Sequence, residues 1–338
     1  MVRITKYDNL NAYSDQKDLF TSRRWLEVIA KTYGFEFYQV YDTVSDNSVF
    51  FTLLNDLKGK RLVSLPFCDY IDTLTISRAS FKRIVNEIRK AFPNLPIILK
   101  TNYLQQELLG KNVRNAYYHT IKVSDYRSIQ RNYTPAFRRG VNKALKNGVK
   151  INYNQTYAGL QDFFRLYAKL RLTKFNSLPQ PFSFFKNIFE VFIKNDSGFL
   201  LNATYKEKVI ASIVVLKHKN TLFYKFGASD IDFLNHRPNN LVFDALIRFA
   251  AENGYSEINL GLSGASNQYK GLVRFKEAMG GAKHVINYYR LSPADYNSDR
   301  ENVAADYLQK LTRLIVSSYQ KDEKIINEFS ELLYRNFA

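Results

Sequence analysis

The stretch with the clearest chemical potential runs from Gly261 to Lys276 and contains several glycines and serines. It follows a short predicted strand, 257–260, and leads into a short predicted helix. In open α/β sheets, ligands bind beyond the carboxyl ends of strands. Arg274 and Lys276 at this place have the charge to neutralise a phosphate or a developing oxyanion. A plain turn is the competing interpretation.

A second candidate region is strongly basic. No Asp or Glu occurs between Asp125 and Asp162. A helix is predicted over 126–148, interrupted near Pro135. Its cations are Arg127, Arg131, Arg138, Arg139, Lys143 and Lys146, with Lys150 just beyond. Three of them, Arg139, Lys143 and Lys146, share one helix face, so a polyanion would relieve their mutual repulsion. A solvated helix face is the alternative.

Metal-dependent, cysteine-dependent and nucleotide-dependent chemistry finds no support in the sequence. His119, His218, His236 and His284 are far apart in the sequence and lack metal-ligand spacing. Cys68 is the only cysteine, and we expect it to be buried. No phosphate-binding loop or dinucleotide fingerprint occurs. The sequence therefore predicts neither a metal nor a cofactor.

Composition limits the class of protein. The 338 residues are 46% hydrophobic, which is enough for two packed cores. The formal net charge of +18 favours an anionic partner, such as nucleic acid, a phosphorylated substrate or an acidic membrane face. The N-terminus does not resemble a signal peptide, and the longest apolar run, 209–216, falls short of the roughly 20 residues that span a bilayer. We expect a cytoplasmic protein without a transmembrane segment, with peripheral membrane contact left open.

Hydrophobic periodicity and turn signals define the expected elements. Helices are predicted at 21–32, 80–92, 126–148, 157–174, 182–194, 237–253 and 272–279, with amphipathic helices after 295. Strands are predicted at 35–43, 48–57, 61–67, 97–101, 117–123, 149–153, 198–205, 208–217, 221–227, 257–260 and 284–291. From 149 onward the order is β-α-α-β-β-β-α-β-α-β, which is that of a GNAT acyltransferase domain.

The predicted fold class is α/β, with two GNAT-like domains of a duplicated fold and a C-terminal helical extension. The predicted domains are 1–116, 117–292 and a helical segment at 293–338. The helix starting near Arg237 and Asn239 offers free N–H groups to an anion. However, no glycine occurs between Gly227 and Gly254, so the glycine-rich pyrophosphate loop of acyl-CoA-dependent GNAT enzymes is missing. This argues against acetyl-CoA as the donor.

Six segments together resemble the Fem-type peptidoglycan bridge enzymes. They are 20–26, 64–70, 137–151, 171–174 with Phe184 and Phe185, 237–241, and 271–276. The resemblance covers most of residues 20–290. It implies twin GNAT-like domains with a cleft between them, and transfer of an amino acid from aminoacyl-tRNA to an amine of a peptidoglycan or other phosphorylated cell-envelope precursor. It also implies that Phe275 and Lys276 contact the reaction centre, with Lys276 stabilising the charge that develops at the ester carbonyl.

One further residue enters through the same resemblance, and three others follow from what the aminolysis of an ester requires. Lys174 stands where many relatives have an arginine that binds substrate phosphate. Asp69 is placed to accept the amine proton or bind the acceptor, although a loop or capping aspartate fits equally well. Tyr224 and Tyr269 are expected to line the cleft. Two alternatives stay open, namely an acyl-CoA-dependent N-acyltransferase and a non-catalytic module that binds RNA or an anionic glycan through its basic segment.

Overall fold

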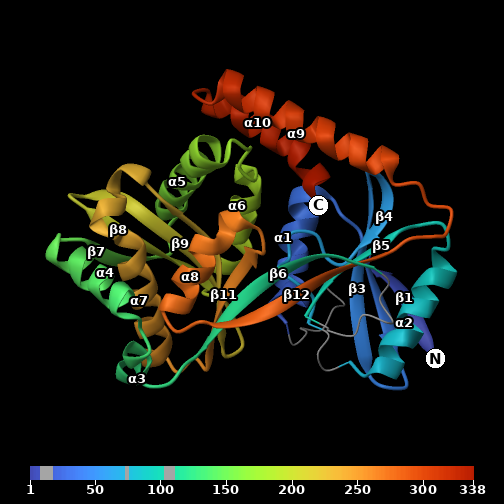
Figure 1. Cartoon of the computed structure of the whole chain (residues 1–338), viewed down its shortest axis with the longest axis horizontal. Helices are drawn as coiled ribbons and strands as arrows, with labels where there is room; N and C mark the ends of the chain where they lie inside the picture. Colours follow the sequence, from blue (N-terminus) through green and yellow to red (C-terminus); the bar gives the residue numbers. More distant parts are fainter. Residues whose placement is uncertain (8–17, 73–75, 103–110) are drawn as a thin grey trace. The chain divides into compact units, whose positions relative to one another are not determined.

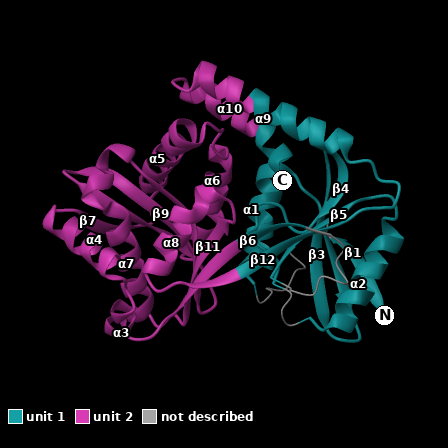
Figure 2. Ribbon diagram, in the orientation of Figure 1, with its two compact units in different colours: residues 1–116, 285–311, 332–338 teal, residues 117–284, 312–331 magenta. Residues whose placement is uncertain are grey.

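The computed structural model describes residues 1–7, 18–72, 76–102 and 111–338 (Figure 1). Two compact units are present (Figure 2). The first comprises 1–116, 285–311 and 332–338, and the second comprises 117–284 and 312–331. The domain boundaries expected from the sequence remain a prediction.

The first unit is an α/β arrangement whose strands follow the order β1-β2-β3-β4-β5-β12. The strands are β1 (Val2–Tyr7), β2 (Phe37–Asp42), β3 (Asn47–Asp56), β4 (Gly59–Val63), β5 (Ile97–Thr101) and most of β12 (Ala282–Leu291). Strands β4 and β5 are parallel, and the other pairs are antiparallel. The sequence interpretation missed β1, and β4 ends earlier than the predicted strand at 61–67.

The helices of this unit are α1 (Arg23–Tyr33) and α2 (Arg78–Ala91), with η2 (Leu19–Thr21), η7 (Tyr334–Phe337) and the first part of α9 (Asp299–Tyr319). Ser22 caps α1 by accepting the N–H of Trp25, and Gly34 ends it with a φ of +67°, a conformation that costs glycine little. A buried ion pair between Arg61 and Asp56 (2.7 Å) stabilises the β3–β4 hairpin.

The second unit has the strand order β6-β11-β10-β9-β8-β7. Its strands are β6 (Lys111–Lys122, from residue 117), β7 (Lys150–Asn154), β8 (Gly198–Tyr205), β9 (Lys208–His218), β10 (Thr221–Ser229) and β11 (Glu257–Gly264). Strands β7 to β10 form antiparallel pairs, whereas β10 and β11 are parallel. The order of elements from β7 onward is the one expected from the sequence.

The helices of the second unit are α3 (Tyr126–Arg131), α4 (Pro135–Lys146), α5 (Tyr157–Phe175), α6 (Phe182–Ile188), α7 (Pro238–Glu252), α8 (Lys270–Ala278) and α10 (Glu323–Leu333). Short helical turns are η4 (Phe189–Ile193, π), η5 (Ile231–His236) and η6 (Asn267–Tyr269), and the end of α9 also belongs to this unit. The predicted interruption at Pro135 is confirmed, because Thr134 accepts the N–H of Phe137 and caps a new helix there.

Helices cover both faces of the strands of the second unit. Helices α4, α7 and α8 pack on the face that carries Phe199 and Leu201, where the hydrophobic core lies. Helix α5 packs on β9 and β10 and contributes nothing to that core, so it covers the opposite face together with α6. This alternation follows from the two-residue period of strands.

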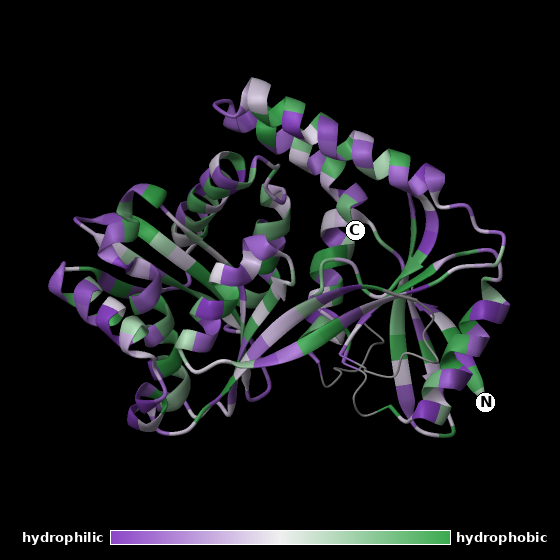
Figure 3. Cartoon of the chain, viewed as in Figure 1, coloured by the Kyte–Doolittle hydropathy of each residue, from purple (hydrophilic) through white to green (hydrophobic). Residues whose placement is uncertain are grey.

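Helices α9 and α10 are amphipathic, with hydrophobic and hydrophilic positions alternating along both (Figure 3). Among the described helices, none combines the length and the apolar character needed to cross a bilayer.

Candidate active site

The centre of the candidate site is the carboxyl end of β11. Strands β10 and β11 pair from Thr221 opposite Glu257 to Phe223 opposite Asn259, yet β11 continues to Gly264. Gly261 has a φ of +70°, and its N–H donates to the Asn259 side chain at 2.8 Å. The predicted loop therefore starts later than expected, since Gly261 to Gly264 belong to the strand. Parallel strands that part at their carboxyl ends provide a place for a ligand.

Lys276 of α8 is anchored to this strand end. Its side chain is 1% exposed. The ammonium donates to the carbonyl oxygens of Gly261 (2.8 Å) and Leu262 (3.2 Å) and to Oγ of Ser263 (2.9 Å). A buried ammonium needs such acceptors, because desolvation is costly. Lys276 thus fixes the end of β11 and places a positive charge there, away from bulk water.

His119 of β6 lies in the neighbouring strand. It is 0% exposed, and neither ring nitrogen has a hydrogen-bond partner within the described residues. Burial, together with the positive charge of Lys276 and smaller effects of Lys283 and His284, lowers the pKa of His119 to about 4. The imidazole is therefore neutral and a free acceptor at neutral pH. Sequence reasoning missed this residue, because only strand pairing brings it near Lys276.

Aromatic side chains connect Phe275 to Tyr224. The ring of Phe275 lies 5.6 Å from that of Phe137 and 5.4 Å from that of Phe243. Tyr224 of β10 also contacts Phe243, with ring centroids 4.8 Å apart. The structure thus brings Tyr224, Phe275 and Lys276 into one region, with Phe275 partly buried against the hydrophobic core.

The basic face of α4, which we define as Arg139, Lys143 and Lys146, is exposed. Arg138 is exposed as well, and it donates to the carbonyl oxygen of Gln130 at 3.1 Å. Helix α4 approaches the start of α7 closely, since a Cβ on Gly140 would lie 2.5 Å from Nδ2 of Asn240. A larger residue at position 140 would force the Asn240 side chain to shift, and the basic face therefore lies on a helix that packs directly beside the N-terminus of α7.

The N-terminus of α7 offers few free donors. Arg237 is exposed and has a φ of +58°, and the following Pro238 has no N–H. The N–H of Asn240 donates to the carbonyl of Arg237 (3.1 Å), and the side chain of Asn239 donates to Ser229 (3.2 Å). The N-terminus of α7 therefore offers a pyrophosphate few backbone N–H groups to bind.

Other predicted residues lie elsewhere. Arg274 is exposed on α8, and Tyr269 packs against Gly264. Lys174 lies in the last turn of α5, on the opposite face of the strands from α4 and α7, with its ammonium 5.5 Å from the ring of Phe175. The structure does not bring Lys174 together with Lys276.

Asp69 belongs to the first unit, where its negative charge helps to raise the pKa values of Asp18 and Lys100. Burial raises the pKa of Asp18 to about 7, and the negative charges of Asp72 and Asp69 contribute further. Burial lowers the pKa of Lys100, but the charges of Cys68, Tyr288 and Asp69 outweigh it and raise the pKa. The Lys100 ammonium also donates to the carbonyl oxygen of Cys68 at 2.5 Å. Cys68 is buried, as expected. The raised pKa of Asp18 is a property of the first unit that the sequence did not reveal.

Comparisons with known proteins concern the fold of the chain. Residues 131–271 match the family model of the acetyltransferase (GNAT) domain. None of the curated proteins matches the chain.

Solved structures with a similar fold include FemX, at a TM-score of 0.59 and 11% identity, covering 83% of this chain and 94% of that one. L-PGS from Bacillus licheniformis gives a TM-score of 0.54 at 12% identity, covering 86% and 92%. The C-terminal domain of a lysylphosphatidylglycerol synthetase described as putative, from Agrobacterium fabrum, gives 0.51 at 11%, covering 83% and 90%.

Residues 131–271 therefore match a GNAT acetyltransferase domain, and the likeness of the chain to the Fem type is confirmed at the level of the fold.

Proposed function

We propose that the chain transfers an aminoacyl group from aminoacyl-tRNA to a primary amine of a phosphorylated cell-envelope precursor, forming an amide bond. The observation that carries the proposal is the buried Lys276 ammonium at the parted end of β11, with the unpartnered imidazole of His119 close by. Aminolysis of an ester needs both a positive charge for the developing oxyanion and an acceptor for the amine proton.

The proposed reaction proceeds by attack of the neutral amine on the ester carbonyl. A C–N bond forms, and the carbonyl oxygen gains negative charge near Lys276. Burial lowers the pKa of His119 most, and the positive charge of Lys276 lowers it further; the oxyanion offsets that charge, so the imidazole becomes more basic as the intermediate forms. His119 takes the amine proton, the ester C–O bond breaks, and the proton passes to the leaving ribose oxygen.

Two features favour an aminoacyl-tRNA donor. The exposed basic face of α4 matches the phosphate backbone of RNA. The start of α7 lacks the glycines and the free N–H groups that a CoA pyrophosphate would use. The match to the acetyltransferase (GNAT) domain favours a second candidate, an acyl-CoA-dependent N-acyltransferase.

The test offers the full chain either aminoacyl-tRNA or acetyl-CoA, with a UDP-linked sugar peptide as acceptor, and detects the amide product by mass spectrometry. We expect product only with aminoacyl-tRNA. Product with acetyl-CoA alone would establish the second candidate, and RNA binding without any product would leave only a binding module.

Variants assign the chemistry to the site. Lys276→Met should abolish transfer, and Lys276→Arg should retain part of it because the positive charge is kept. The matched control is Lys270→Met, since Lys270 is an exposed lysine of the same helix. Thermal melting establishes that each variant is folded. Full turnover by a folded Lys276→Met variant would refute the proposed role.

A further inference from the structure

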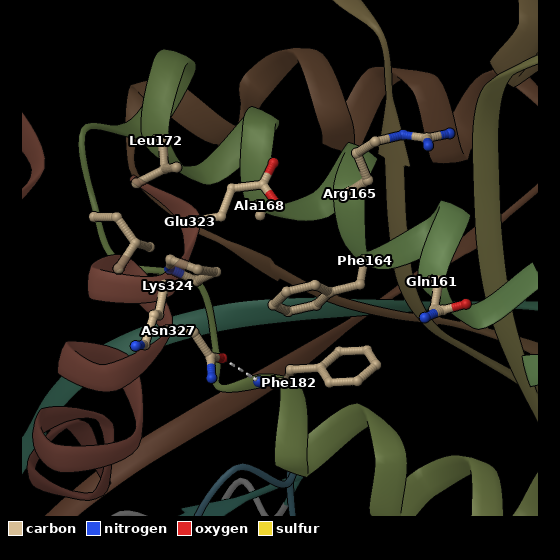
Figure 4. A pocket seen from close by; sticks show the side chains of 11 residues that line it. Gln161, Phe164, Arg165, Ala168, Leu172, Phe182, Glu323, Lys324 and Asn327 are labelled. Atoms are coloured by element: carbon tan, nitrogen blue, oxygen red, sulfur yellow. Dashed lines mark hydrogen bonds between the residues drawn. The ribbon is translucent and has the colours of Figure 1, made fainter. Parts of the chain in front are cut away.

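The second unit contains a cavity of about 550 Å³ that the proposed acyl transfer does not use (Figure 4). It lies between α5, the segment that leads into α6, and the first turns of α10. Helix α5 covers the face of the strands opposite to α7 and α8, so the strands separate the cavity from Lys276. The volume falls in the range of small-molecule pockets.

Hydrogen bonds hold the walls of this cavity in place. The Asn327 side chain of α10 accepts the N–H of Phe182 at 3.0 Å. Glu331, one turn further along α10, accepts the hydroxyl of Ser183 at 2.7 Å. These carboxylate and amide groups cap the start of α6, which would otherwise leave N–H groups unsatisfied. The wall formed by α10 is therefore a fixed part of the unit.

The interior of the cavity is apolar and aromatic. The rings of Phe164 and Phe182 have centroids 4.9 Å apart and lie side by side in Figure 4. Leu172 and Ile326 are buried and complete the apolar lining. Such a surface favours a ligand with an apolar ring or a branched chain.

Two opposite charges stand at the edge of the cavity. Glu323 and Lys324 both line it and are exposed, and neither side chain forms an ion pair or hydrogen bond within the described residues. Figure 4 shows Glu323 reaching toward Ala168 of α5, whereas Lys324 follows the other edge beside Asn327. Arg165, the third charged residue of the lining, is paired with Asp162 at 2.7 Å. The available charges are thus one carboxylate and one ammonium.

We infer that this cavity binds a zwitterion of the amino-acid type with an apolar side chain. The ligand's ammonium pairs with Glu323, its carboxylate pairs with Lys324, and its side chain lies against Phe164 and Phe182. The same chemistry is available from a free amino acid or from a short apolar peptide with free ends. The inference does not depend on the donor or the acceptor proposed above.

Isothermal titration calorimetry of the full chain with four small-molecule ligands tests this assignment. L-Phenylalanine and the dipeptide Phe-Phe carry both charges, phenethylamine lacks the carboxylate, and 3-phenylpropionate lacks the ammonium. We expect saturable binding of at least one zwitterion and about tenfold weaker binding of each single-charge analogue, equivalent to about 1.4 kcal/mol. Whichever zwitterion binds with the lower dissociation constant shows whether the natural ligand is a free amino acid or a short peptide. Absence of saturation by either one at millimolar concentration, or equal binding of all four, would overturn the inference.

Two variants and a control test whether the ligand binds in the cavity. Ala168→Phe fills it and should abolish binding, and Glu323→Gln should remove the advantage of phenylalanine over 3-phenylpropionate. Lys321→Met is the control, because Lys321 is an exposed lysine just before α10 that does not line the cavity. Unchanged affinity in a folded Ala168→Phe variant would place the ligand elsewhere and refute the assignment.

Discussion

Replacement of His119 by phenylalanine should make the protein less sensitive to acid while it impairs transfer. Burial, reinforced by the charges of Lys276, Lys283 and His284, lowers the pKa of His119 from its usual 6.5 to about 4. Between these values the unfolded chain binds a proton that the folded chain does not bind. The free energy of unfolding therefore falls as the pH falls from 6.5 to 4.

The size of this effect follows from the shift. A difference of about 2.5 pKa units corresponds to about 3 kcal/mol of stability, fully present above pH 6.5 and lost by pH 4. The phenylalanine variant cannot bind the proton, so it should lack this contribution to the pH dependence. Above pH 7 it should be as stable as the parent or more so, because two buried nitrogens without partners are removed.

Urea denaturation of both proteins at one-unit steps from pH 4 to pH 8 measures the difference. His284→Gln serves as the control, since His284 shares the neighbourhood but has Thr120 as a hydrogen-bond partner at 3.0 Å. Parallel stability curves for the parent and His119→Phe would refute the assignment of a neutral buried imidazole. Full transfer activity in the variant would refute the proton-accepting role alone.

Three further outcomes are expected. Arg61→Met should lower the free energy of unfolding by about 3–5 kcal/mol in denaturant titrations, because it leaves the buried Asp56 carboxylate without its partner. Stability equal to that of the parent would contradict this. Asp18→Asn should be more stable than the parent at pH 8 but not at pH 4. The pKa of Asp18 is raised to about 7, so ionisation of its carboxyl group at higher pH destabilises the folded state. Melting temperatures of both proteins at the two pH values measure this, and an equal difference at both pH values would contradict it. Alanine at all three positions of the basic face of α4 should reduce the slope of log affinity for tRNA against log salt by about 2–3, with an unchanged slope excluding phosphate contacts there.

Much of the fold was predictable because the local signals agree with one another. Strands β5 and β8 have the predicted bounds, and the helix break at Pro135 follows from the cap at Thr134 and the conformation of proline. The GNAT element order could be read from the sequence because each strand and helix has its own hydrophobic period. Strand β1 was missed, since its six residues alternate weakly and depend on pairing with β2.

The candidate site was only partly accessible to the sequence. A lysine near the end of a strand could be identified from type and position, but its acceptors, Gly261, Leu262 and Ser263, depend on how α8 docks against β11. His119 lies 157 positions before Lys276 in the sequence, and only the pairing of β6 with β11 makes them neighbours. The composition determined the basic net charge, and the positions of the histidines in the sequence showed no metal-ligand spacing. Tertiary structure alone decided which charges are buried, which are paired, and therefore which pKa values shift, because desolvation depends on the packing of distant segments.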